Sequence, residues 1–191
     1  MRKIPFLWIV VAVIVLCVLW IISGYNGFVT TKAAVDNAWS QVETQYQRRM
    51  DLVPNLVSTV KGAANFEQET FREVTEARSV FAQAKSIGDR SGEIQAASGF
   101  DGALSRLLVT VEAYPQLQAT QAFRDLMTQL EGTENRVAVA RKDFNDSVLA
   151  YNLRVSRFPG LLLAKLFGFA SEKAFDAVEG AEKAPSVDFT Q

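Results

Sequence analysis

The most constraining feature of this chain is an uncharged apolar run from Ile4 to Ile22, which follows Arg2 and Lys3 directly. A helix of about 20 apolar residues spans a hydrocarbon core of roughly 30 Å. A cleaved signal peptide has an apolar region of only about 7–15 residues and a small-x-small cleavage site. The run here is longer, and no such site follows it. We therefore predict a retained transmembrane anchor over residues 1–24 that contacts membrane lipid through Phe6, Leu7, Trp8, Leu19, Trp20 and Ile22.

The charges beside this run bear on its orientation, because short cytoplasmic flanks are enriched in Lys and Arg. Arg2 and Lys3 precede the run, whereas the first twenty residues after it contain only Lys32. This asymmetry favours a single-pass protein with a cytoplasmic N-terminus and a body outside the cytoplasm.

Composition excludes several classes of chemistry. The 191 residues include no His and one Cys, and Cys17 lies inside the apolar run. Structural zinc, haem, iron–sulfur ligation and His-assisted nucleophilic catalysis therefore lack their residues. Without Arg2 and Lys3, 18 basic residues face 21 acidic ones, a net charge of about −3 that provides no basic stripe for nucleic acid. We predict no enzyme activity, no metal, no cofactor and no nucleic-acid partner.

After the run, apolar residues recur with a helical period. Residues 25–66 carry two apolar columns with an interval of seven, offset by three and four, and residues 123–158 repeat the same interval. This period is typical of helices in a bundle or coiled coil. Pro54 is expected to bend the first of these long helices without ending it, because the columns continue beyond it.

Two shorter helices are predicted between the long ones, at about Phe66–Ser86 and Glu93–Tyr114, with a turn over residues 88–92. At about 1.5 Å per residue, the long helices measure about 60 Å each and the short ones about 30 Å. We therefore predict an all-α fold, in which the N-terminal transmembrane helix is followed by an elongated antiparallel bundle over residues 25–159. The two shorter helices should pack only on the half that is distal to the membrane.

In this arrangement, the two long helices share an apolar stripe near the membrane that they cannot bury alone. We predict that it mediates packing with a partner, and it consists of Phe28, Val35, Trp39, Val42, Phe144, Val148, Tyr151 and Phe158. Other copies of the chain, the C-terminal segment and another protein are all compatible partners. We favour other copies, and hence a homo-oligomer, because self-association is the commonest solution.

The C-terminal part, residues 160–191, begins with an apolar segment from Gly160 to Phe169. This segment is expected either to enter the membrane interface or to fill the gap between the long helices. The polar end that follows is predicted to be extended, with Val187 and Phe189 as anchors.

One charge lies on the apolar stripe of the first long helix. An antiparallel alignment that levels Phe28 with Phe158 brings Arg49 opposite Val137, one turn from Glu134. A charge on an apolar stripe is costly unless it is paired. We therefore predict a buried Arg49–Glu134 ion pair within a polar layer that fixes helix register, made of Arg49, Asn55, Glu131 and Glu134.

Two motifs are specific enough to suggest a family: RRMDLVPNLV at residues 48–57 and TENRVAVAR at residues 133–141. AWSQV at residues 38–42 and EAYPQL at residues 112–117 accompany them. These stretches resemble the LemA family of bacterial membrane proteins, over nearly the whole chain. The resemblance implies a single anchor in the bacterial plasma membrane, a long antiparallel helical bundle and no assigned catalytic activity. Because the body of the family has also been placed on the cytoplasmic side, both orientations stay open.

Three functions remain. We favour a non-enzymatic, self-assembling scaffold of the envelope. The alternative is a membrane-tethered adaptor or sensor for another membrane protein, such as a protease or a transporter. An enzyme that uses Glu131 and Glu134 with Arg136 or Arg141 is the least favoured, because the di-iron pattern of helical bundles requires His.

Overall fold

A computed structural model of the chain describes residues 6–61 and 68–176. Within these residues the chain forms helices and no strand, which confirms the all-α fold. The helices are α1 (Phe6–Lys61), α2 (Gln68–Ile87), α3 (Arg90–Glu112), α4 (Pro115–Gln118), α5 (Gln121–Ser156) and α6 (Gly160–Phe167). The expected tail with Val187 and Phe189 lies outside the described residues.

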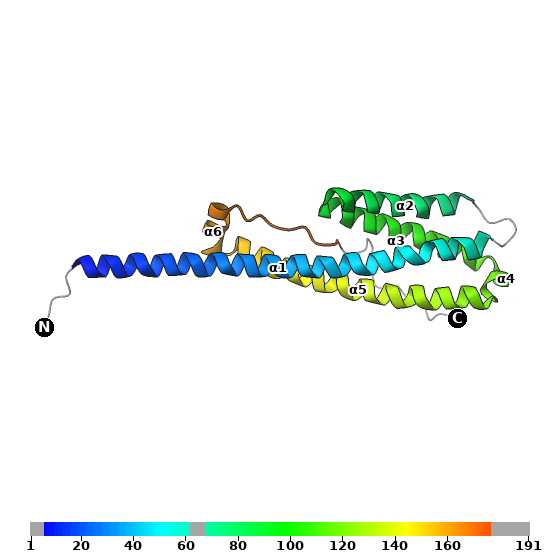
Figure 1. Cartoon of the computed structure of the whole chain (residues 1–191), viewed down its shortest axis with the longest axis horizontal. Coiled ribbons are helices and arrows are strands. Elements are labelled where there is room, and N and C mark those ends of the chain that lie inside the picture. The colour runs from blue at the N-terminus through cyan, green and yellow to red at the C-terminus, as the bar shows by residue number, and fades with distance from the viewer. Residues whose placement is uncertain (1–5, 62–67, 177–191) are drawn as a thin grey trace, which may run out of the picture.

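The helices form an elongated antiparallel bundle (Figure 1). α5 runs back along α1, and the hairpin of α2 and α3 covers only the half of this pair that is distal to the apolar end of α1. Helix lengths had predicted this arrangement. In the other half, called membrane-proximal here, α6 and the segment after it lie against α1 and α5.

α1 is a single helix of 56 residues that joins the apolar run to the bundle and continues through Pro54. An 18-residue window of it has a mean hydropathy of 2.9, and none of that window is buried. The predicted lipid-facing side chains of Leu7, Trp8, Leu19, Trp20 and Ile22 are all exposed, whereas the side chain of Phe6 lies outside the described ones. Such a continuous apolar surface indicates a hydrocarbon environment.

The seven-residue columns form one continuous core along the bundle. α1 contributes Tyr46, Val53 and Leu56, each at most 2% exposed, and α5 contributes Val137 and Phe144 at the same level. α2 and α3 close the distal half with buried side chains that include Val74, Phe81, Phe100, Leu104 and Leu107. The core therefore follows the sequence period closely.

The turn between the two shorter helices differs from the predicted one. The turn expected over residues 88–92 is shorter, because Gly88 takes a left-handed φ of 69° and α3 already begins at Arg90. Pro115 does not lead directly into the last long helix but starts the short helix α4, where its missing N–H costs nothing. Thr120 then caps α5 by accepting a hydrogen bond from the Phe123 N–H.

The chain reverses after α6. Gly168, with φ 76°, ends that helix in the left-handed conformation that glycine favours. Residues 168–176, called the strap here, then run in an extended form from α6 toward the α2–α3 hairpin (Figure 1).

Candidate functional site

The predicted apolar stripe is buried within a single chain. Seven of its eight side chains are at most 5% exposed, namely Phe28, Val35, Trp39, Val42, Phe144, Val148 and Tyr151. The strap covers the aromatic members Phe28, Trp39 and Phe144, so the C-terminal segment is the partner of this part of the stripe. The stripe is therefore not an open surface that needs a second copy. Phe158 is 79% exposed, because α5 ends at Ser156 and the chain turns away before reaching it.

Two phenylalanines fasten the ends of the strap. The ring of Phe169 stacks on Phe28, with 5.0 Å between the ring centroids. At the other end, the ring of Phe175 stacks on Trp39 at 6.0 Å and meets Phe144 edge-on at 5.9 Å. The aromatic members of the stripe thus form two receptor positions in the groove between α1 and α5.

Two asparagines of α5 hold the backbone of the strap between these positions. The Asn152 side chain donates to the Glu172 carbonyl and accepts from the Glu172 N–H, both at 2.8 Å. Seven residues earlier, Asn145 makes the same pair of bonds with Phe175, at 3.1 and 2.9 Å. Each asparagine satisfies both main-chain groups of one strap residue, so α5 binds the backbone of this segment through side-chain amides.

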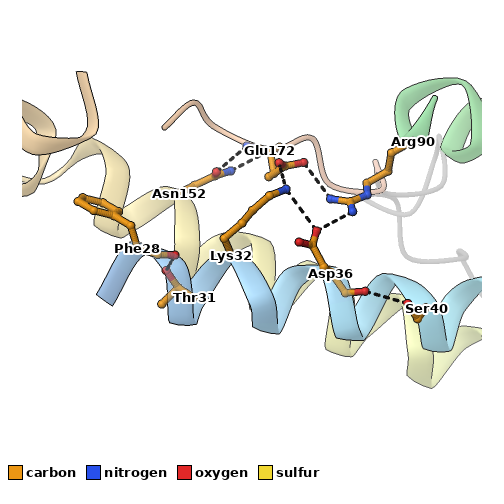
Figure 2. Close-up of polar contacts among 8 residues, drawn as sticks. All are labelled: Phe28, Thr31, Lys32, Asp36, Ser40, Arg90, Asn152 and Glu172. Carbon is orange, nitrogen blue, oxygen red and sulfur yellow. Dashed lines mark hydrogen bonds and ion pairs between the residues drawn. The ribbon is translucent and has the colours of Figure 1, made fainter. Parts of the chain in front are cut away.

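Charged side chains tie the middle of the strap to two further helices (Figure 2). Glu172 contacts Lys32 of α1 and lies 3.2 Å from Arg90 of α3. Asp36 completes the ring, at 2.7 Å from Arg90 and 3.3 Å from Lys32. Burial alone would raise the pKa of Asp36, but hydrogen bonds from Arg90 and Lys32 outweigh it and hold this pKa below its ordinary value.

A second polar cluster lies at the middle of the bundle. Arg49, 5% exposed, donates to the Asp101 carboxylate at 2.8 Å and also contacts Glu134. The Tyr46 hydroxyl donates to Asp101 at 2.8 Å, and Arg141 donates to both of these groups. Burial raises the pKa of Asp101, while Arg141 and Arg49 oppose that shift.

The polar layer expected from the sequence is thus only partly present. Arg49 meets Glu134, although the Glu134 side chain is 57% exposed and lies at the edge of the cluster. Asn55 and Glu131 are exposed and outside it, because Leu56 and Leu130 occupy the inward positions next to them. The expectation that these two residues are buried was wrong.

Asp101 and the two asparagines escaped the sequence analysis, although each leaves a signal. Asp101 follows Ala97 by four and precedes Leu104 by three, so it lies on the apolar face of its helix as a charge that needs partners. Asn145 and Asn152 are seven apart, which places both amides on one helical face. The columns predicted from the seven-residue interval contained apolar residues only, so this polar pair was missed.

Glu93 of α3 is a third buried polar group, 3% exposed, and its Oε2 has no hydrogen-bond partner. Burial, followed by the nearby Glu43 carboxylate, raises its pKa to about 7. Glu43 is itself paired with Lys85 at 3.3 Å. In the part of the chain that the structure describes, no cluster of three or more Cys, Asp or Glu side chains is arranged to hold a metal ion.

This geometry defines a class: an antiparallel helical bundle with a long apolar N-terminal helix, whose groove next to that helix is filled by an extended segment of its own. A profile of the LemA family matches residues 38–189, a range that contains the strap and both asparagine clasps but begins after Phe28, Lys32 and Asp36. The chain belongs to the LemA family.

Several named proteins are similar to it. Magnetosome protein MamQ 2 of Paramagnetospirillum magneticum and magnetosome protein MamQ of Magnetospirillum gryphiswaldense are each 30% identical over 174 residues, covering 79% of this chain and 64% of theirs. Protein LemA of Metamycoplasma hominis is 21% identical over 154 residues, covering 81% of this chain and 69% of its own. The chain therefore spans less than two thirds of the length of the magnetosome proteins. None of these names denotes an enzyme. Together with the N-terminal apolar helix, family membership makes this a membrane-associated protein.

Proposed function

We propose that this protein is a non-enzymatic membrane scaffold that assembles by exchanging its strap between copies. The observation that supports this is the way the strap is held. Its contacts are two aromatic positions, two asparagine clasps and one ring of charges, and all of them lie in a groove that every copy carries. Exchange of an identical element between protomers is a low-cost route to assembly.

Exchange is feasible because the described strap is joined to α6 through a single glycine. Gly168 separates it from α6, and α6 keeps its own contacts with α1 through the buried Leu163 and Ala164. A strap that enters the groove of a neighbour makes the same contacts as one that enters its own groove. The balance between the two states then depends on the local concentration of copies, which anchoring in one membrane raises.

The contact between Lys32 and Glu172 offers a direct test, since a carbodiimide couples an amine to a carboxylate in contact with it. We would co-express one tagged copy with Lys32→Arg and a differently tagged copy with Glu172→Gln. Within either copy, the Lys32–Glu172 amide cannot form. A covalent dimer with both tags, at twice the chain mass of 21.1 kDa and with this cross-link identified by mass spectrometry, is the expected product.

The Lys85–Glu43 pair, at 3.3 Å between α2 and α1, is the matched control because it lies outside the strap. Its cross-link should form within each copy and leave the chains monomeric. Formation of that cross-link without any Lys32–Glu172 dimer would show that straps stay in their own grooves, and would refute scaffold assembly by exchange.

An adaptor for another membrane protein is the second candidate, and the asparagine clasps favour it. They bind main-chain atoms only, so an extended segment of another protein with a suitably placed aromatic residue would fit the same groove. Co-purification of a stoichiometric foreign chain, lost when a cross-link fixes the strap in its own groove, would support this candidate.

We further propose that the N-terminus is cytoplasmic and the body lies outside the cytoplasm, on the basis of Arg2 and Lys3. The only cysteine, Cys17, is inside the anchor. A Val109→Cys variant, at a position 65% exposed on α3, therefore reports the side of the body. Labelling in spheroplasts by an impermeant maleimide is expected, and labelling only after lysis would reverse the orientation.

A further inference from the structure

A cleft lies where α1 leaves the apolar run and meets the end of α5 and the start of α6. It measures about 440 Å³. Apolar side chains and two arginines share its lining, notably Trp20, Phe28, Arg154, Arg157, Phe158 and Leu163. Neither the strap nor the polar clusters described above contribute to it.

The first arginine of the cleft lies against α1. The Arg154 guanidinium lies 5.8 Å from the centre of the Phe28 ring and against the backbone of Gly27. A Cβ atom on Gly27 would fall 1.7–2.7 Å from three guanidinium atoms, so a larger residue here would displace the guanidinium from this position. The guanidinium therefore lies next to the first turns of α1 beyond the apolar run.

Neither arginine has an acidic partner among the described residues. Arg154 and Arg157 are exposed and take part in no ion pair there. The sequence around the two arginines also lacks acidic residues, since residues 4–35 and residues 147–171 contain no Asp or Glu. These two ranges form the membrane-proximal end, which is therefore cationic although the whole chain has a net charge of −1.

The depth of the cleft matches the headgroup layer of a bilayer. Gly27 is five residues beyond Ile22, the end of the apolar run, which corresponds to about 8 Å along the helix. The polar layer on each side of a hydrocarbon core is about 5–8 Å thick. Trp20 lies within the run, and Phe158, Leu162 and Leu166 are 79%, 59% and 70% exposed beside the cleft. Aromatic and apolar side chains of this kind are typical of the membrane interface.

We propose that this cleft is a binding site for an anionic phospholipid of the membrane that α1 spans. The phosphodiester lies between Arg154 and Arg157, which donate hydrogen bonds to its oxygens. The glycerol and upper acyl region lie against Trp20 and Phe158. This assignment accounts for the unpaired arginines and for the exposed Phe158.

Native mass spectrometry of the full-length protein in micelles tests the assignment. The protein is mixed with equal amounts of phosphatidylglycerol and phosphatidylcholine, and the bound fraction of each lipid is measured. Each arginine near an anionic surface contributes about fivefold in binding, so a preference for phosphatidylglycerol of roughly 25-fold is expected. Arg154→Gln/Arg157→Gln should abolish this preference, and inorganic phosphate in excess should not displace the lipid.

The matched control is Arg48→Gln/Arg136→Gln, which removes two exposed arginines that line a different surface pocket on α1 and α5. It should keep the preference. Arg157→Gln alone, which leaves the packing of Arg154 intact, should lower it by about fivefold. Equal binding of the two lipids by the unmodified protein would overturn the proposal. So would an equal loss in the control variant, or displacement by phosphate, which would indicate diffuse attraction or a free-phosphate site instead.

Discussion

Removal of the Phe175 ring should release the strap while leaving the bundle folded. Phe175 is 7% exposed and is the last buried anchor of the described strap, with Trp39 and Phe144 around it. Burial of a Phe side chain contributes roughly 1.5–3 kcal/mol. Aromatic pairs add about 0.5–1.5 kcal/mol. We therefore expect Phe175→Ala to weaken strap docking by about 3 kcal/mol, because the asparagine clasps remain and the released segment lies at the end of the described chain.

At 1.4 kcal/mol per tenfold, this loss raises the open population of the strap roughly 100-fold. Its reporters are the Glu172 and Phe175 amides, whose hydrogens are held by Asn152 and Asn145. Hydrogen–deuterium exchange of peptides that cover residues 168–176 should accelerate by about this factor. Peptides from α1 and α5 should keep their exchange rates.

Leu149→Ala is the control, since it truncates a side chain on α5 that is 58% exposed. It should change no exchange rate in the strap. Two results would contradict this account of the strap as a separate local unit. One is unchanged exchange in Phe175→Ala, and the other is acceleration by the same factor along the whole bundle.

Two further predictions concern the buried carboxylates. Because the pKa of Glu93 is about 7 when folded and 4.5 ordinarily, the folded state binds its proton more tightly. This tighter binding adds roughly 3 kcal/mol to the free energy of unfolding at low pH. The contribution is lost as the pH rises from 4.5 to about 7. Glu93→Gln should remove this loss in thermal melts followed by circular dichroism, whereas the exposed Glu76→Gln should not. Asp101→Ala leaves Arg49 without its main buried partner, and should lower the free energy of unfolding by roughly 3 kcal/mol. A loss no greater than that of the exposed Asp143→Ala would show that Asp101 is dispensable.

The bundle could be predicted from the sequence because the core positions of its two long helices repeat every seven residues, with Arg49 as the charged exception. Length alone then placed the short helices on the distal half. The strap could not be found in this way, since an extended segment with Phe169 and Phe175 at its ends has no period to detect. Its receptor residues were recognised as an apolar stripe, but their cover was assigned to other copies.

Polar contacts were harder to predict because they depend on helix rotation as well as register. The antiparallel alignment brought Arg49 to the correct level and so to Glu134. It did not show that Arg49 also faces α3, where Asp101 provides the buried partner. It placed Asn55 and Glu131 at one level too, yet both are rotated toward solvent. The position of a residue along the bundle follows from counting residues. The direction in which its side chain faces depends on how α2 and α3 pack on the two long helices.

The anchor and the groove form one mechanical body, because α1 passes from one to the other without a break. Gly24 and Gly27 would weaken an isolated helix at this junction by about 1 kcal/mol each relative to alanine. Here Leu163 of α6 and Arg154 of α5 occupy the space beside them, so the junction is supported from outside. We therefore expect a tilt of the anchor to move the groove that holds the strap. If straps are exchanged between copies, the angle between neighbouring grooves also fixes the angle between their anchors. Through this coupling, an assembly formed outside the bilayer would act on the shape of the membrane itself.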